Sequence, residues 1–287
     1  MGDHPSYQNF ILQSQARQYS WSGESFLSIK SFYNGAAHYR IGKRHYDIGE
    51  KDYLVLNECT HYDMEIDSRQ ATQSFCLFFD PAFVQKVGAA ILASEEKCLD
   101  FAFPNENGVS FLERKYRQEG EVSKLLLLAN QQMTWRKDDL LWQEQLFHQL
   151  LKALFFQNHR AIKEANQLSF AKAATREEIY RRLYFAKDYM DANFTAPLSL
   201  EDIAAVAQLS SNHFLRTFKQ LFRTSPSQYI AHLRMQKAYQ LLQDSNESIS
   251  TIVYTAGYSS LSNFSWEFKK HFGLSPSDYR KKVIHRK

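Results

Sequence analysis

The sequence predicts an α+β chain of two domains: a β-barrel with accompanying helices, then an all-α domain with two helix-turn-helix motifs joined by a helix. Three observations predict it. Short strand-like segments fill the first part, helical periodicity follows them, and a segment near the C-terminus recurs after fifty residues. The length of 287 residues also exceeds the usual ~100 to 200 residues of one domain. We place the domains at residues 1–160 and 176–287, with a linker at 161–175.

The first part of the chain has the pattern of a series of short strands. Between residues 26 and 79, apolar segments of five to eight residues alternate with turn signals. Asn34-Gly35 is a strong hairpin signal, because both residues tolerate the positive φ of a type I′ turn. The regular spacing of the segments favours a small β-barrel or sandwich. The predicted strands cover residues 26–33, 37–41, 44–48, 52–57, 62–66 and 74–79.

Helical periodicity replaces the strand pattern after Asp80-Pro81, with predicted helices at residues 82–93, 112–133 and 138–159. The third helix has an apolar stripe wider than a lone surface helix normally buries. Either the preceding helix of the same chain or the same helix of a second subunit covers this stripe, and the sequence leaves both alternatives open. Residues 161–175 lack clear amphipathic order and are expected to link the two domains.

The C-terminal part contains an internal repeat, which constrains the architecture more than local propensity does. Seven residues recur at a constant offset of fifty positions. Upstream of each copy, two apolar helices flank a short turn with small residues, as in a helix-turn-helix. The recurring residues are Phe218, Lys219, Phe222, Ser225, Pro226, Ser227 and Tyr229, with the counterparts Phe268, Lys269, Phe272, Ser275, Pro276, Ser277 and Tyr279.

Each repeat is expected to present one recognition helix. Ser210 and Ser260 are suitable N-caps, because a serine hydroxyl accepts a hydrogen bond from a backbone N–H two or three residues on. Phenylalanines spaced i, i+4 face inward and leave polar side chains outside, where Asn and Arg can read base edges with two hydrogen bonds. The expected DNA contacts are Ser211, Asn212, His213, Arg216, Thr217 and Lys219 on the first helix and Leu261, Ser262, Asn263, Ser265, Trp266 and Lys269 on the second.

Residues 227–244 are predicted to form one continuous helix between the repeats. Roughly 18 residues at 1.5 Å each span ~27 Å, which suits two reading heads about one DNA turn, ~34 Å, apart. Residues 175–287 carry 16 Lys and Arg against 10 Asp and Glu, whereas the rest carries 19 against 21. This basic excess favours double-stranded DNA as the partner.

Several locations and covalent arrangements are disfavoured. No apolar stretch approaches the ~18 residues of a membrane span, and residues 1–10 lack the layout of a signal peptide. We therefore expect a cytoplasmic protein that associates with the nucleoid and not with a membrane. Cys59, Cys76 and Cys98 are an odd number and far apart, so we expect reduced thiols and neither disulfides nor a zinc knuckle.

From about residue 175 onward the chain resembles the DNA-binding domain of the AraC/XylS family of bacterial transcription regulators. The resemblance rests on the segments SLEDIA (199–204), FLRTFK (214–219), RMQKA (234–238), AGY (256–258) and GLSPSDYR (273–280). It implies a transcription regulator that contacts DNA, and it leaves open whether RNA polymerase is a further partner. Two positions depart from the family's pattern: Arg223 stands where a glycine is usual, and Trp266 where a polar or basic residue is common.

The N-terminal part is similar to the cupin-like sensing domain of the same family, through GKRHYDIG (42–49), DYLVLN (52–57) and FFDPAFV (78–84). This similarity implies an unknown small-molecule effector inside the barrel and a homodimer formed through Asp138 to His159. The candidate effector contacts are His38, Tyr39, His45, Tyr46 and His61. Tyr39, Tyr46, Tyr53 and Tyr62 either line a ligand cavity with polar tips or pack in the barrel core.

Cupin folds also include metal enzymes, so the histidines need a second interpretation. A cupin metal site places two histidines two residues apart on one strand, and the chain contains no His-x-His pair. The clustered cysteines of a DNA-repair alkyltransferase and the GxSxG, Walker and HExxH motifs are missing as well. The sequence therefore predicts no enzyme, no metal and no cofactor. It predicts a sequence-specific DNA-binding regulator, with activation and repression both open.

Overall fold

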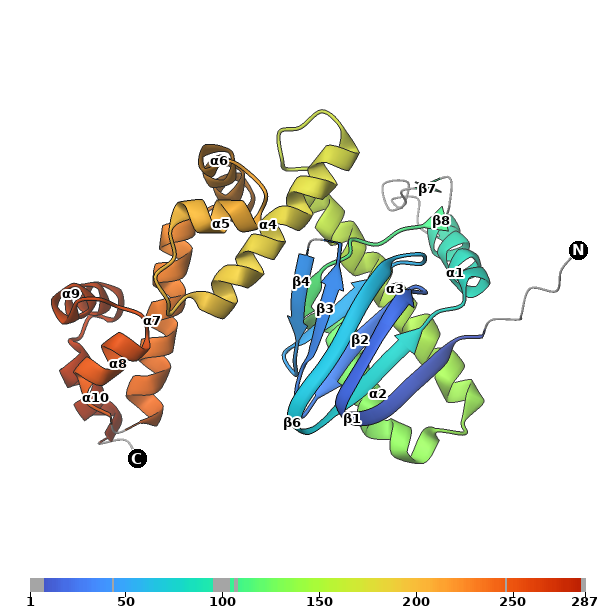
Figure 1. Ribbon diagram of the computed structural model, residues 1–287, viewed down its shortest axis with the longest axis horizontal. Helices are drawn as coiled ribbons and strands as arrows, with labels where there is room; N and C mark the ends of the chain where they lie inside the picture. Colours follow the sequence, from blue (N-terminus) through green and yellow to red (C-terminus); the bar gives the residue numbers. More distant parts are fainter. Residues whose placement is uncertain (1–7, 43, 95–103, 106–107, 246, 285–287) are drawn as a thin grey trace, which may run out of the picture. The chain divides into compact units, whose positions relative to one another are not determined.

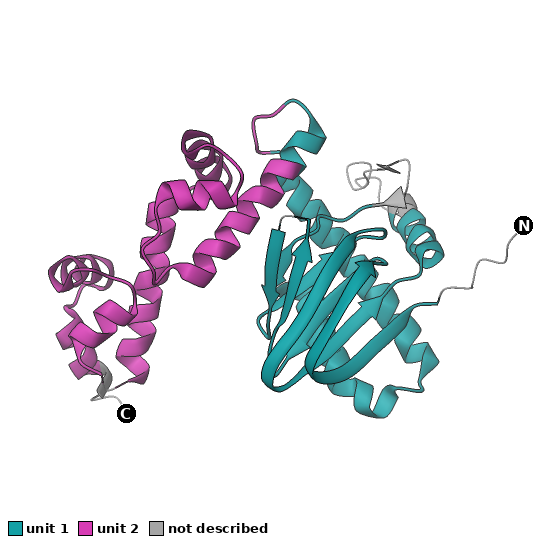
Figure 2. Cartoon of the chain, viewed as in Figure 1, with its two compact units in different colours: residues 1–166, 171–177 teal, residues 167–170, 178–287 magenta. Residues whose placement is uncertain are grey.

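The computed structural model describes the chain in two compact units (Figures 1 and 2). Unit 1 comprises residues 1–166 and 171–177, and unit 2 comprises residues 167–170 and 178–287. Within these units the structure describes residues 8–42, 44–94, 104–105, 108–245 and 247–284. The predicted combination of a barrel-like sheet with helices and a separate all-α part is confirmed.

Seven strands of the described residues form one antiparallel sheet in unit 1, in the order β4-β3-β6-β2-β5-β9, with β1 paired to β6. Strand β6 is the centre of this barrel-like sheet, because it pairs with β1 over most of its length and with β2 and β3 over its two halves. The strands are β1 (Phe10–Glu24), β2 (Ser28–Tyr33), β3 (Ala37–Ile41), β4 (Arg44–Ile48), β5 (Asp52–Leu56), β6 (His61–Phe78) and β9 (Lys115–Arg117).

The sheet differs from the sequence-based prediction at β1 and β6. Strand β1 was not predicted, because most of its side chains are polar and exposed and only its pairing with β6 makes it a strand. Residues 62–66 and 74–79, predicted as two strands, belong to one strand, β6, apart from Phe79. Residues 67–70, which lie between the two predicted strands, are polar, and the backbone stays extended through them. A short pair, β7 (Pro104–Asn105) and β8 (Gly108–Val109), stands apart from this sheet.

Helices α1 (Pro81–Ser94), α2 (Gly120–Arg136) and α3 (Leu140–Ala165) complete unit 1. The predicted helix at 112–133 is wrong at its start, because residues 115–117 pair with β5 as β9 and the helix begins only at Gly120. Of residues 161–175, expected as a linker, 161–165 belong to α3 and 173–175 to α4 (Ala173–Asn193), and residues 166–172 lie between the two helices. Burial of Ala161, Ile162 and Ala165 explains the longer helix.

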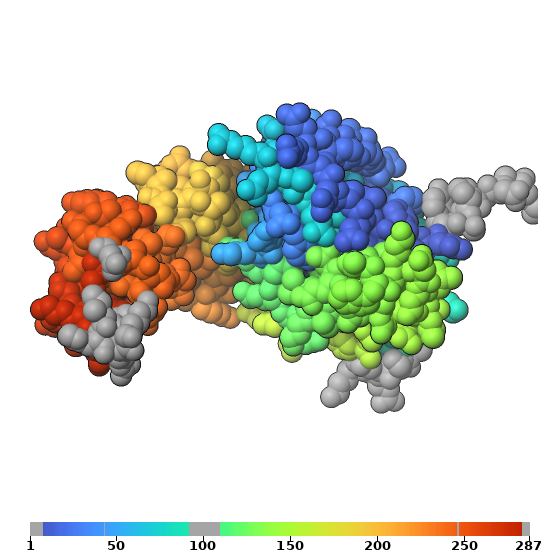
Figure 3. All heavy atoms as spheres, turned by 90° about the horizontal axis from the view of Figure 1, so that it is seen from below, coloured from blue at the N-terminus to red at the C-terminus, as the bar shows by residue number. Residues whose placement is uncertain are grey.

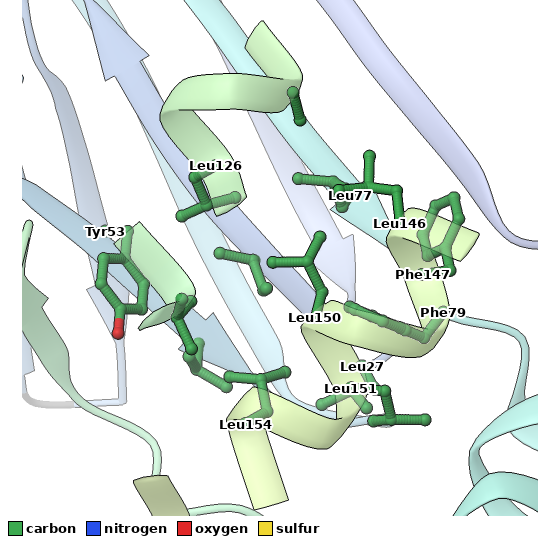
Figure 4. Packing of buried hydrophobic residues seen from close by; sticks show 14 of the residues in the cluster. Leu27, Tyr53, Leu77, Phe79, Leu126, Leu146, Phe147, Leu150, Leu151 and Leu154 are labelled. Atoms are coloured by element: carbon green, nitrogen blue, oxygen red, sulfur yellow. The ribbon is translucent and has the colours of Figure 1, made fainter. Parts of the chain in front are cut away.

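The apolar stripe of α3 lies in the core of unit 1. Leu150, Leu151 and Leu154 are at most 2% exposed and belong to one cluster with Leu126 of α2 and Leu77 of β6. Figure 4 shows this cluster between the helices and the sheet. Burial at about 25 cal/mol per Å² of apolar surface makes such a cluster the main stabilising contribution. Of the two alternatives for covering the stripe, packing within the chain is the one that the structure shows.

Part of the α2–α3 hairpin nevertheless exposes apolar side chains. Trp135 at the end of α2 is 72% exposed, and Leu140 and Leu141 at the start of α3 are 78% and 66% exposed. Figure 3 shows the face of unit 1 on which green atoms of this region lie beside the blue atoms of the N-terminal strands. The hairpin therefore carries an apolar patch outside the core.

Unit 2 repeats one arrangement twice along the chain. Helices α5 and α6 form the first helix-turn-helix, α8 and α9 form the second, and α7 joins them, as predicted for residues 227–244. The core of the second motif contains Phe264, Phe268 and Val253, all 0% exposed, packed with Met235 and Ala238 of α7. The helices are α5 (Leu200–Val206), α6 (Ser211–Phe222), α7 (Pro226–Asp244), α8 (Ile249–Thr255), α9 (Leu261–Phe272) and α10 (Pro276–Ile284).

Two further observations concern the described residues as a whole. Cys59 is exposed and Cys76 buried, and both are free thiols, while Cys98 lies outside the described part of the chain. Among the helices that the structure describes, none is both long enough and apolar enough to cross a bilayer.

Candidate nucleic-acid interface and effector cavity

Serine side chains begin each helix of the two helix-turn-helix motifs. The Ser199 hydroxyl accepts a hydrogen bond from the Asp202 backbone N–H at 3.0 Å, and the Asp202 carboxylate accepts one from the Ser199 N–H, which completes a capping box. Ser210 and Ser260 cap the two recognition helices by accepting from the backbone N–H groups of His213 and Asn263. The prediction of these two N-caps is confirmed.

Phenylalanines anchor both recognition helices in the same geometry. The ring centroids of Phe214 and Phe218 lie 5.4 Å apart with an interplanar angle of 50°, and those of Phe264 and Phe268 have the same two values. All four side chains are 0% exposed. The repeat that the sequence shows is thus a repeat of side-chain packing, and it fixes the same outer face on each helix.

The outer face of α6 consists of Asn212, Leu215, Arg216 and Lys219, all exposed. Asn212 and Arg216 offer groups that read bases, and Lys219 offers a charge for phosphate. Ser211, also expected to contact DNA, is half-buried at the start of the helix.

Two side chains of α6 do not fit the predicted role in DNA contact. Thr217 is 1% exposed and its hydroxyl donates to the His213 carbonyl at 2.7 Å, because the i, i+3 and i, i+4 neighbours of the phenylalanines turn inward. The prediction for Thr217 is therefore corrected: it is a core residue. His213 is half-buried, its ring lies against Phe170, and its Nε2 is buried.

The outer face of α9 differs in chemistry from that of α6. Trp266 stands fifty residues after Arg216 and is 65% exposed, and the Lys270 ammonium lies 5.0 Å from the centroid of its ring. Lys270, which sequence reasoning missed, adds a second cation beside Lys269. The other exposed predicted positions are Leu261, Ser262 and Asn263, and Ser265 is half-buried.

A set of close contacts on α7 joins the two motifs. Arg234 donates from Nε to the Phe194 carbonyl at 2.6 Å and from Nη2 to the Ala196 carbonyl at 2.9 Å. Gly257, in the turn of the second motif, has φ +88°, and a β-carbon there would lie 2.7 Å from Thr195 Cα and 3.0 Å from Arg234 Nε. The loop after α4 therefore contacts both α7 and the turn of the second motif.

Unit 1 contains a cavity of about 470 Å³ on the face of the sheet opposite the helices. This volume falls within the ~300 to 1,000 Å³ typical of small-molecule sites. Strands β1, β2, β3 and β6 supply most of the lining, which is rich in aromatic side chains. Its members are Phe10, Leu12, Ser14, Gln15, Ala16, Tyr19, Trp21, Glu24, Phe26, Lys30, Tyr39, Tyr62, Met64, Ile66, Ser74, Cys76 and Phe78.

Strand alternation decides which side chains reach the cavity. Lys30 of β2 and Cys76 of β6 are paired across the sheet and face the cavity, while Ile29 and Phe75 face the helices. On β1 the apolar lining positions are even up to Ala16 and odd at Tyr19 and Trp21, because a register shift lies between Ala16 and Gln18. Gln15, beside the shift, and Glu24, at the end of the strand, also border the cavity. The bulge keeps both halves of β1 turned toward the cavity.

Lys30 is a charged side chain in the lining of the cavity, and only 2% of its surface is exposed. Its ammonium lies 3.6 Å from the centroid of the Phe78 ring and 5.4 Å from that of Tyr62. Burial lowers the pKa of Lys30 to about 8. Burial also raises the pKa of Tyr39, Tyr62 and Cys76, which are therefore neutral near pH 7.

The same alternation places one of the predicted effector contacts in the cavity and the others outside it. Tyr39 lines the cavity, but Tyr46 does not, although it is buried. His38, His45 and His61 are exposed on the outer face, where His38 Nδ1 lies 2.6 Å from Asp47 Oδ1. Of the other tyrosines considered, Tyr62 lines the cavity, and Tyr53 packs on the helix side with its hydroxyl donating to Gln157.

Sequence reasoning missed Lys30 because the local pattern does not distinguish it from a surface lysine. Lys30 stands between Ile29 and Ser31 in the predicted strand 26–33, where alternation beside a buried isoleucine is typical of an exposed side chain. Among the described residues, no group of three or more His, Cys, Asp or Glu side chains is arranged to hold a metal ion.

Comparison with known families identifies both units. Residues 11–173, more than half of the chain, match the family described as AraC-like ligand binding domain. Residues 203–282 match a family described as helix-turn-helix domain. The two matches cover the cavity and both recognition helices.

Similar individual proteins match mainly over one third of the chain. The MmsAB operon regulatory protein of Pseudomonas aeruginosa is 39% identical over 95 residues, 33% of this chain and 31% of that protein. The lactose operon transcription activator of Staphylococcus xylosus is 35% identical over 95 residues, 33% of this chain and 34% of that protein. The chain thus matches about a third of the length of these curated relatives. A crystal structure of an AraC-type regulator from Chromobacterium violaceum is 38% identical, covers 36% of this chain and 91% of its own, and has a TM-score of 0.34.

Proposed function

The chain belongs to the AraC/XylS family of transcription regulators, and from this premise we propose that it binds a specific DNA site and that a small molecule in the cavity of unit 1 controls this binding. The observation that carries the proposal is the duplicated pair of capped, phenylalanine-anchored helices with exposed polar faces. A lone amphipathic helix exposes polar residues for solubility, but two helices of identical packing, joined through α7, suit two successive contacts on one duplex.

The two recognition helices are suited to different kinds of DNA contact. Arg216 is suited to a bidentate contact with guanine, and Asn212 to one with adenine. The face of α9 presents Trp266 with Lys269 and Lys270, which suits contact with a thymine methyl or sugar and with phosphate. The first helix therefore supplies most of the base discrimination and the second supplies affinity.

Control by a ligand requires unequal binding to two states of the protein. An effector shifts the population toward DNA-competent molecules only if it has higher affinity for that state. The cavity of unit 1 is the site for this effector, since it has the volume and the mixed lining of a small-molecule site.

The apolar patch at Trp135, Leu140 and Leu141 supports a homodimer through the α2–α3 hairpin. This surface replaces the wider interface over residues 138–159, because Leu150, Leu151 and Leu154 are already used in the core. A dimer would place two copies of unit 2 on one operator and raise avidity.

Selection of bound fragments from a random DNA pool tests the proposed function. The full chain should enrich a sequence with two conserved blocks about one helical turn, ~34 Å, apart, on one face of the duplex. A chain with Arg216 and Asn212 both replaced by alanine should enrich a block altered at the positions read by α6. Absence of any enriched sequence would refute sequence-specific binding.

A further inference from the structure

Lys30 is a cation without a counter-ion inside an apolar cavity. Its side chain is 2% exposed, and it forms no hydrogen bond or ion pair with any residue that the structure describes. Its contacts are the rings of Phe78 and Tyr62, at 3.6 and 5.4 Å from their centroids. The second charged residue of the lining, Glu24, is exposed and does not pair with Lys30.

A buried charge of this kind is costly unless something pairs with it. Removal of an ammonium from water without a partner disfavours the charged form, and proteins usually satisfy such groups with an opposite charge. The titratable groups that face Lys30 are Tyr19 of β1, Tyr39 of β3, and Tyr62 and Cys76 of β6. Burial raises the pKa of Tyr39, Tyr62 and Cys76, so they provide no negative charge near neutral pH.

We propose that the cavity binds a hydrophobic organic acid, whose carboxylate pairs with Lys30 Nζ while its apolar body lies against the aromatic walls. This assignment rests on the proposed function, in which the cavity is the effector site, and it names the chemical class of the effector. One lysine matches the single charge of a carboxylate. The lining has no arginine with which to bind a phosphate in a bidentate manner.

The walls of the cavity match the rest of such a ligand. Seven aromatic side chains line it, together with Leu12, Met64 and Ile66, and they offer flat apolar surface. Phe10, Leu12 and Tyr19 on β1 are 45 to 48% exposed, so the cavity opens to solvent along this strand. A ligand enters there with its apolar part outermost and its carboxylate toward Lys30.

Matched pairs of acids and amides test the proposal by titration calorimetry on the full chain. The probes are 1-naphthoate with 1-naphthamide, and decanoate with decanamide, because each pair differs in charge and hardly in shape. Near pH 7 at least one acid should bind about tenfold or more tightly than its amide, the effect of one charge-assisted hydrogen bond. Between pH 7 and pH 10 this preference should decline, since Lys30 loses its proton above a pKa of about 8.

Two lysine variants assign the effect to one side chain. Lys30→Met keeps the length and the apolar stem without the charge, and it should abolish the preference for the acid. Lys51→Met is the matched control, because Lys51 is exposed in the turn between β4 and β5 and does not line the cavity. This variant should keep the preference for the acid over the amide. Equal affinity for acid and amide, no binding of either acid, or an acid preference retained in Lys30→Met would each overturn the proposal.

Affinity for the selected DNA site, measured with and without the bound acid, separates this proposal from the proposed function. An acid that binds through Lys30 without changing DNA affinity supports the ligand class and contradicts effector control. An amide that binds as well as the acid and changes DNA affinity contradicts the ligand class and supports effector control.

Discussion

Arg223 and Gly273 occupy equivalent positions, fifty residues apart, and both end a recognition helix in the left-handed conformation. Their φ angles are +57° and +76°, and the backbone N–H of each donates to the carbonyl of a lysine, Lys219 or Lys269, four residues earlier. Glycine adopts this conformation without a steric cost, whereas a residue with a β-carbon incurs ~1 kcal/mol or more. The first motif therefore carries backbone strain that the second does not.

Arg223→Gly should stabilise unit 2. Relief of the strain is expected to raise the free energy of unfolding by roughly 0.5 to 1 kcal/mol, after a small loss through the greater freedom of glycine in the unfolded chain. The hydrogen bond from Arg223 Nη2 to Gln167 Oε1, 3.3 Å long and exposed, adds little. Urea denaturation of both proteins measures the difference, and an unchanged or lower midpoint would contradict the strain argument.

Gly257→Ala should destabilise unit 2 far more than Gly273→Ala. Both positions have positive φ, but a β-carbon at Gly273 meets nothing within 4 Å, whereas at Gly257 it lies 2.7 Å from Thr195 Cα and O. We expect a cost of ~1 kcal/mol at Gly273 from strain alone and a cost of at least ~2 kcal/mol at Gly257. Denaturation midpoints of the two variants measure both costs. Equal losses of stability would show that Thr195 moves away from the new β-carbon at little cost.

Arg216→Ala should weaken binding to the selected DNA site by ~1 to 3 kcal/mol and leave binding to random DNA nearly unchanged. Lys219→Ala is the matched comparison, since Lys219 lies one turn further on the same exposed face. Lys219→Ala should weaken binding to the selected site and to random DNA by a similar factor. It should also reduce the salt dependence of binding by about one charge. Fluorescence anisotropy at several salt concentrations distinguishes the two effects; a uniform loss for Arg216→Ala would assign that residue to phosphate.

Lys30→Met should stabilise the ligand-free protein near neutral pH. The pKa of Lys30 is lowered from 10.5 to about 8, so the unfolded chain binds more protons than the folded chain between these pH values, and stability rises with pH across this range. The cost of burying the charge, on the order of 3 kcal/mol, is present below about pH 8 and disappears near 10.5. The stability that Lys30→Met gains over the wild type, measured by urea denaturation, should therefore be largest below about pH 8 and disappear near pH 10.5. A gain in stability that does not vary with pH would contradict this prediction.

Replacement of both Leu140 and Leu141 by Glu should convert the proposed homodimer to monomers without unfolding unit 1. The two side chains are 78% and 66% exposed, so charge is tolerated in the monomer but not in an apolar interface. Sedimentation velocity of the wild type and the double variant measures the change. Glu at Leu127, 42% exposed on α2, provides a comparison for charge placed outside the hairpin turn.

The DNA-binding unit followed from the sequence because its determinants are local. Serine caps, phenylalanines at i, i+4 and a repeat with constant offset are all visible along the chain, and the structure reproduces them as Ser210, Ser260 and two equal phenylalanine pairs. Thr217 was misjudged because its polarity suggested exposure, whereas it lies three residues after Phe214 on the buried face and its hydroxyl bonds to the backbone of its own helix.

The cavity was harder to predict because its members come from strands far apart in sequence. Strand β1 has no apolar pattern of its own and depends on β6 for its conformation. The histidines were chosen by residue type, whereas alternation along β3 puts His38 outside and Tyr39 inside. Lys30 follows Ile29 and precedes Ser31, a pattern that gives no sign of burial, and its distances from Phe78 and Tyr62 required the folded sheet.

The register shift between Ala16 and Gln18 shows that β1 keeps its pairing with β6 across a local irregularity. Deletion of one residue elsewhere in β1, such as Gln13 or Ser20, would reverse the alternation of the side chains beyond it, so that Phe10 and Leu12, or instead Trp21, would turn outward. A one-residue change in length would thereby exchange an aromatic wall for a polar one while the helices and the DNA-reading unit stay untouched. Divergence among such sensors can therefore proceed by insertion and deletion in the first strand as readily as by substitution.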